Sequence, residues 1–189
     1  MNDINSKIAH GAVWMVAFKL IDRSAGLVST IILARLLSPA DFGLVAMAMV
    51  LIAALQLMVS FSFDVLLIQN PQAARDEFDT AWTFNCLFAC AAAMVLALLA
   101  HPASIFYSEP RLTPVIYWLA LGFAVQGFSN IGPVIFRREM RFDREFKFLL
   151  AKRVATLAVT IPLAFLLRNY WTLVIGQLLG GCIMVALSY

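Results

Sequence analysis

The sequence predicts an all-α integral membrane protein with six transmembrane helices, and two observations support that class. Of the 189 residues, 62% are hydrophobic and only 13% are charged, whereas a soluble domain carries about 25% charged residues. The charged residues are also unevenly spaced, and they leave uncharged stretches at residues 42–63, 80–108, 112–136, 154–167 and 169–189. Because about 20 apolar residues of helix cross the hydrocarbon core, most of these stretches are long enough to span a membrane.

The first three helices are predicted at residues 12–37, 41–63 and 80–100. The first is long and unusually polar for a membrane span. Pro39 separates it from the second, since proline is tolerated at a helix start but not in a helix interior. The third helix is expected to end before Pro102 for the same reason.

The last three helices are predicted at residues 114–134, 148–167 and 170–189. Pro114 marks the start of the fourth helix, and the fifth follows a basic segment of the chain. Trp171 lies at the start of the sixth helix, where an aromatic ring is typical of the membrane–water interface.

Lysine and arginine residues set the expected orientation. Nine of the 14 fall in segments on the side of the N-terminus, and Lys152 and Arg153 are counted there, whereas three fall in the opposite loops. Cytoplasmic segments are enriched in these residues, so the sequence predicts a cytoplasmic N-terminus. The sixth helix reaches Tyr189 without a tail, and we expect residues 1–189 to be the N-terminal lobe of a longer chain.

Three charged residues lie in the interior of the first predicted helix, apart from Arg35 near its end: Lys19, Asp22 and Arg23. Arg23 lies about 16 Å down the helix axis, where a charge costs about 2.5–3.5 kcal/mol to insert. Ionisable residues in membrane spans usually line functional cavities, so we favour a helix that lines a watery, cationic cavity. The alternative is a local ion pair in which Asp22 neutralises Lys19 and Arg23 is buried against other helices.

Uncharged polar residues in the spans have two interpretations. They can line the same cavity, or they can join helices by hydrogen bonds worth about 0.6 kcal/mol each, and for any single one we favour the second. They are Gln56, Asn85, Gln126, Asn130 and Gln177. The glycines of Gly176–Gly180 have the small-xxx-small spacing that allows helices to approach closely.

A basic segment precedes the fifth predicted helix. Its five cations are Arg137, Arg138, Arg141, Arg144 and Lys147. We favour a loop that fixes the topology, because inner loops are basic in general. The alternative is attraction of anionic lipid head groups or a phosphorylated substrate. Phe142, Phe146 and Leu149 recur at helical spacing within this segment.

The sequence contains no motif of a catalytic, metal or cofactor site. A net charge of +3 is too small to indicate a nucleic-acid surface. The three cysteines lie in apolar stretches without metal-ligand spacing. His10 and His101 are expected on opposite sides of the membrane, so no Ser-His-Asp set can form. We therefore expect a passage for a substrate, with no enzyme activity, no metal and no cofactor.

A distinctive stretch lies at residues 33–43, which read LARLLSPADFG. Residues 68–69, 138–142 and 171–176 add shorter motifs, which read IQ, REMRF and WTLVIG. Together these motifs resemble oligosaccharide and polysaccharide flippases, the Wzx-like branch of the MATE/MOP exporter superfamily. The resemblance spans essentially the whole chain.

The resemblance implies one lobe of a two-lobe transporter that moves undecaprenyl-pyrophosphate-linked oligosaccharides across the bacterial inner membrane. The implied partners are the lipid-linked oligosaccharide, membrane lipids, and a C-terminal lobe or second subunit. In that family an arginine of the first helix belongs to the cavity, and Arg23 matches it. Arg23 is therefore the first expected pyrophosphate-binding residue and Lys19 the second, with Asp22 beside them.

Three alternatives stay open at the level of sequence. A drug or cation antiporter of the same superfamily would call for an acidic cavity, whereas the first helix has two cations to one acid. A polymerase or acyltransferase would usually show a large outer loop, and the longest one here is short. A membrane scaffold without transport activity would need neither Lys19 nor Arg23.

Overall fold

The computed structural model describes residues 2–59, 75–130 and 142–189. These residues form six helices and no strand, which confirms the all-helical class. The helices are α1 (Asn2–Leu36), α2 (Pro39–Val59), α4 (Arg75–Phe106), α5 (Leu112–Gly127), α7 (Phe142–Leu167) and α8 (Trp171–Ser188).

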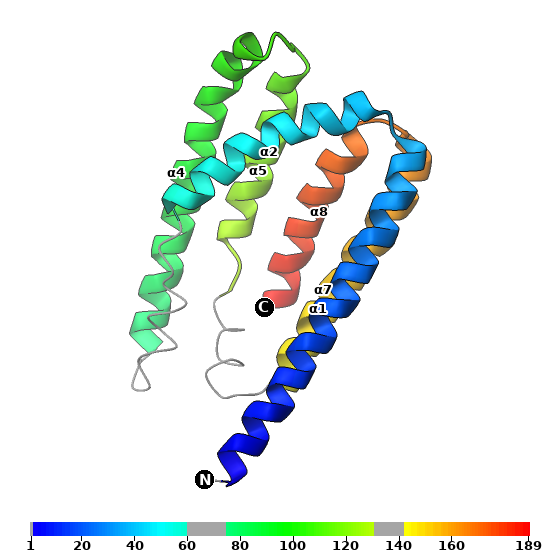
Figure 1. The fold of residues 1–189 in the computed structure, drawn as a ribbon. Helices are drawn as coiled ribbons and strands as arrows, with labels where there is room; N and C mark the ends of the chain where they lie inside the picture. The colour runs from blue at the N-terminus through cyan, green and yellow to red at the C-terminus, as the bar shows by residue number, and fades with distance from the viewer. Residues whose placement is uncertain (1, 60–74, 131–141) are drawn as a thin grey trace.

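Five of the helices pack side by side, and α2 lies across them (Figure 1). Along the row, α4 packs on α5, α5 on α8, α8 on α7, and α7 on α1, while α2 contacts α5 and α4. Apolar side chains fill the region between α2, α4, α5 and α8. Ala48, Leu96, Ile116 and Val174 are each no more than 1% exposed there. The long helix α1 therefore joins the row mainly along α7.

Four of the described helices are long and apolar enough to cross a membrane. By length and composition these are α2, α4, α7 and α8, so the chain is a multi-pass membrane protein. α5 is apolar but has 16 residues. α1 has 35 residues, with Lys19, Asp22 and Arg23 near its middle. Crossing by α1 and α5 stays a prediction.

The helix limits differ from the predicted ones in ways that have local causes. α5 was expected to continue to residue 134, but residues 128–130 are already non-helical. The carbonyl of Gly127 ends this helix, because it accepts hydrogen bonds from Asn85 Nδ2 at 3.0 Å and Cys86 Sγ at 3.2 Å. Two side chains from α4 thus take up an acceptor that would otherwise continue the helix.

α7 begins at Phe142, not at residue 148. The part of the basic segment that includes Arg144 and Lys147 is therefore helix and not loop. α1 and α4 also begin earlier than expected, at Asn2 and Arg75. In each case the helix begins with one or more polar turns before its apolar part, and the apolar pattern does not reveal these turns. The expected end of α4 before Pro102 is wrong as well, since α4 continues to Phe106 with Pro102 inside it, as membrane helices tolerate.

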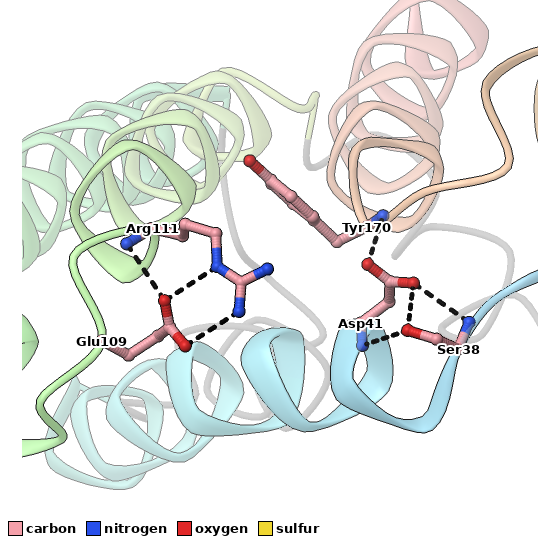
Figure 2. A network of polar contacts seen from close by, with 5 residues as sticks. All are labelled: Ser38, Asp41, Glu109, Arg111 and Tyr170. Atoms are coloured by element: carbon pink, nitrogen blue, oxygen red, sulfur yellow. Dashed lines mark hydrogen bonds and ion pairs between the residues drawn. The ribbon is translucent and has the colours of Figure 1, made fainter.

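One carboxylate joins the starts of two helices at the end of the molecule where α2 and α8 begin (Figure 2). Ser38 and Asp41 form a capping box around Pro39, with Ser38 N donating to Asp41 Oδ2 at 3.0 Å and Asp41 N to Ser38 Oγ at 3.3 Å. The other oxygen of Asp41 accepts from Tyr170 N at 3.2 Å. The motif LARLLSPADFG therefore fixes α2 against α8.

The adjacent loop, between α4 and α5, has its own ion pair (Figure 2). Arg111 Nε and Nη2 donate to the two carboxylate oxygens of Glu109 at 2.8 and 2.9 Å. This hydrogen bonding by Arg111 lowers the pKa of Glu109. Nearby, Trp118 and Trp171 pack edge to face, with ring centroids 6.3 Å apart. Aromatic rings thus gather at this end, as the sequence predicts for a membrane interface.

Candidate functional site

A cavity of about 440 Å³ lies between α1, α5, α7 and α8. Its lining combines charged and polar side chains with glycines and a few apolar residues. Among the described residues these are Phe18, Asp22, Gln126, Leu149, Lys152, Arg153, Thr156, Gly176, Gln177, Gly180, Gly181 and Met184. The volume falls in the range of about 300–1,000 Å³ that is typical of small-molecule sites.

An ion pair between α1 and α7 crosses one side of this cavity. Arg153 Nε lies 3.1 Å from Asp22 Oδ1, and Arg153 Nη2 lies 3.4 Å from the carbonyl oxygen of Asp22. Gly26, one turn along α1, makes room for the guanidinium, since a β-carbon built there would lie 3.0 Å from Arg153 Nη2. Asp22 therefore has its cationic partner on another helix, and not on α1 as the local alternative held.

Lys152 is the second cation of the cavity. It is partly buried, and its Nζ lies 3.1 Å from Met184 Sδ on α8. A thioether sulfur is only a weak acceptor, so this contact satisfies the ammonium poorly. With Asp22 paired to Arg153, the described lining holds two cations and one carboxylate, an excess of one positive charge.

The count of lysine and arginine places both α7 cations with the inner segments, whereas in the structure both line the cavity. The reason is the start of α7 at Phe142, which puts Lys152 about 15 Å along the helix axis. The sequence does contain a feature that could have located this earlier helix start, namely the helical spacing of Phe142, Phe146 and Leu149. That spacing indicates a helix that begins before residue 148.

The two α1 cations that the sequence singled out lie elsewhere. Lys19 and Arg23 are exposed on α1, and neither belongs to the described lining of the cavity. Asp22 does line it. The assignment of Lys19, Asp22 and Arg23 to a pyrophosphate site stays a prediction.

The five uncharged polar candidates separate into two groups. Gln126 and Gln177 line the cavity. Asn85 lies outside the described lining and joins α4 to the end of α5, because its Nδ2 donates to Gly127 O. Asn130 also lies outside that lining, and its backbone N donates to Ser188 Oγ at 2.9 Å. Gln56 is exposed on α2.

The basic segment is only partly described. Arg144 and Lys147 are exposed on α7, outside the described cavity lining. Arg137, Arg138 and Arg141 lie outside the described residues.

Glycines of α8 allow the wall between α7 and α8 to close tightly. A β-carbon built on Gly176 would lie 3.0 Å from Thr160, and one on Gly180 would lie 3.1 Å from Thr156. The small-xxx-small spacing therefore has the packing role that the sequence indicates. Over residues 2–59, 75–130 and 142–189, no group of three His, Cys, Asp or Glu side chains is placed to hold a metal ion.

Comparison with known proteins shows which family the chain belongs to. A family model described as "Polysaccharide biosynthesis protein" matches residues 32–189. The lipopolysaccharide biosynthesis protein WzxC of Escherichia coli (strain K12) is 24% identical over 177 residues, which cover 94% of this chain and 35% of that protein. The chain thus spans about a third of the length of this relative. No solved structure matches the chain.

Proposed function

This chain belongs to the polysaccharide biosynthesis protein family, and on that premise we propose that it is part of a flippase for lipid-linked oligosaccharides. The substrate is an undecaprenyl-pyrophosphate-linked oligosaccharide, which moves from the inner to the outer leaflet of the bacterial inner membrane. The chain crosses that membrane several times, with its N-terminus in the cytoplasm. A C-terminal lobe or a second subunit completes the transporter, and no nucleic acid takes part.

The observation that carries this proposal is the cavity between α1, α5, α7 and α8, whose described lining has an excess of one positive charge. A pyrophosphate and its sugars cannot enter hydrocarbon unaided, because an unpaired charge there costs many kcal/mol. A cationic cavity offers the pyrophosphate charge-assisted hydrogen bonds, and Gln126, Gln177 and Thr156 supply further polar groups for it. The polyprenyl tail remains in the lipid beside the lobe.

The alternatives receive less support from the same cavity. A cation antiporter needs a carboxylate that is available to its cargo. Asp22 is the only acidic side chain in the described lining, and it is paired with Arg153. A scaffold would not require charges within the bilayer, where each is costly. We infer no catalytic step for this chain.

The test is the leaflet in which the substrate accumulates. In cells that make the polysaccharide, removal of the protein is expected to trap the lipid-linked oligosaccharide in the inner leaflet and to abolish surface polysaccharide. A polymerase or acyltransferase would instead leave single oligosaccharide units in the outer leaflet. Unchanged export without the protein would contradict the proposal.

A further inference from the structure

The three charged groups of the cavity are not equivalent. Arg153 and Asp22 contact each other at 3.1 Å, and the guanidinium also lies against the backbone of α1. Lys152 lines the same cavity as Asp22, but its Nζ contacts Met184 Sδ. Arg153 thus pairs with Asp22, the one carboxylate in the described lining with which Lys152 could otherwise form an ion pair.

The surroundings of Lys152 suit an anionic oxygen better than a sulfur. An ammonium group has three donors and no acceptor, and hydrogen bonds between ionised partners are roughly twice as strong as neutral ones. The amides of Gln126 and Gln177 and the hydroxyl of Thr156 line the same space. An anion in this cavity would therefore displace only a weak contact at Lys152.

From this geometry we infer that Lys152 is the anion-binding residue of the cavity, and that Arg153 is a positioning residue that holds Asp22 away from it. This inference rests on the proposed function, and it names the part of the substrate that the lobe holds: the diphosphate group. Arg153 acts on the ligand through Asp22, because it keeps the cavity free of an unpaired negative charge.

The inference predicts opposite effects for the two halves of one ion pair. Asp22→Asn removes the negative charge and leaves Arg153 free, so the anion should bind more tightly. Arg153→Gln leaves Asp22 free to pair with Lys152, so the anion should bind more weakly. A pair that only braced α1 against α7 would weaken binding in both variants, since either change breaks the same contact.

The experiment measures the affinity of inorganic diphosphate for the full native chain, purified in an uncharged detergent, by titration calorimetry. Lys152→Met is expected to lower the affinity about tenfold or more, which corresponds to the loss of one charged hydrogen bond. Asp22→Asn should raise the affinity, and Arg153→Gln should lower it. The double variant Asp22→Asn/Arg153→Gln should return to the affinity of the unaltered protein, because its cavity again has a net charge of one.

Arg35→Met is the matched control, because it removes an exposed cation at the end of α1 and should leave the affinity unchanged. Wild-type affinity in Lys152→Met, or weaker binding in both single variants of the pair, would overturn the inference. So would displacement of diphosphate by phosphatidylglycerol as readily as by farnesyl diphosphate, since the site would then hold ordinary lipid head groups. These affinities do not depend on export, so failure of the site and failure of the proposed function give different results.

Discussion

Asp41 shows how a single side chain can organise several helices at the residue scale. Its two oxygens serve the first turn of α2 and the backbone N–H of Tyr170, just before α8 (Figure 2). The unpaired N–H groups at a helix start are obligatory donors, and the Asp41 carboxylate accepts from Ser38 N and Tyr170 N. The carboxylate therefore determines where α8 begins relative to α2.

Asp41→Ala is expected to destabilise the protein by about 1–2 kcal/mol, since it removes the acceptor for two helix starts. The loss should appear as a lower midpoint of thermal unfolding in detergent, followed by tryptophan fluorescence. Glu109→Gln is the control, because its partner Arg111 lies in an exposed loop and surface ion pairs contribute little. Equal midpoints for the two variants would mean that Asp41 does not hold α8.

Arg23→Ala tests the residue that the family resemblance singles out. The expected result is loss of surface polysaccharide with an unchanged amount of the protein in the membrane, because the resemblance implies that this cation belongs to the transport path. Arg35→Ala removes another exposed cation of α1 and should preserve export. Normal export by the Arg23 variant would remove this residue from the mechanism.

At the scale of helices, close approach depends on a few glycines. A β-carbon on Gly127 would collide with the β-carbon of Ala89, and both atoms belong to rigid parts of the chain. No described atom lies within 4 Å of a β-carbon built on Gly43. Two glycines in helices thus have opposite environments, although the sequence gives no sign of the difference.

Gly127→Ala is expected to lower the free energy of unfolding by about 1–3 kcal/mol, because α4 and α5 must move apart. Gly43→Ala should leave stability equal or raise it by up to about 1 kcal/mol, since alanine is the better helix former. The stability of both variants is measured from their denaturation midpoints in the same detergent. A Gly127 variant as stable as the Gly43 variant would contradict the packing between α4 and α5.

Apolar patterning predicted the existence and order of the helices, because long apolar stretches separated by polar segments and prolines mark one helix each. It did not predict the starts of α1, α4 and α7, since their first residues are polar in sequence and lie outside the apolar stretches. The same limit hid the place of Lys152 and Arg153, which were counted with the inner cations at the start of the predicted helix, whereas α7 begins earlier and both line the cavity. Asp22 was identified from its cost in the membrane, but its partner, 131 residues away in the chain, could only come from the fold.

At the scale of the whole molecule, the described helices have two distinct ends. The connections around Asp41, Glu109 and Tyr170 gather at one end (Figure 2), and both chain termini lie away from that end (Figure 1). Lysine and arginine are concentrated in the segments that the sequence predicts on the side of the N-terminus. The positive-inside rule then predicts that the Asp41 end lies outside the cytoplasm.

Cysteine labelling tests that orientation. After alanine replaces Cys86, Cys90 and Cys182, Ser108→Cys should react with a membrane-impermeant maleimide in spheroplasts, since this residue is exposed and expected outside. Ser6→Cys should react only after the membrane is permeabilised. The reverse pattern would invert the topology, and it would place the entrance for the substrate at the other end.

Transport by the complete protein tests the central claim most directly. The full native chain is reconstituted in liposomes that carry a fluorescent lipid-linked oligosaccharide. The fraction of the fluorescent label that an added quencher can reach is then followed over time. The account predicts that the protein makes the inner-leaflet fraction accessible, and that Lys152→Met slows this exchange markedly while Arg35→Met does not. An accessible fraction that stays at the value of protein-free liposomes would contradict the claim that this lobe belongs to a flippase.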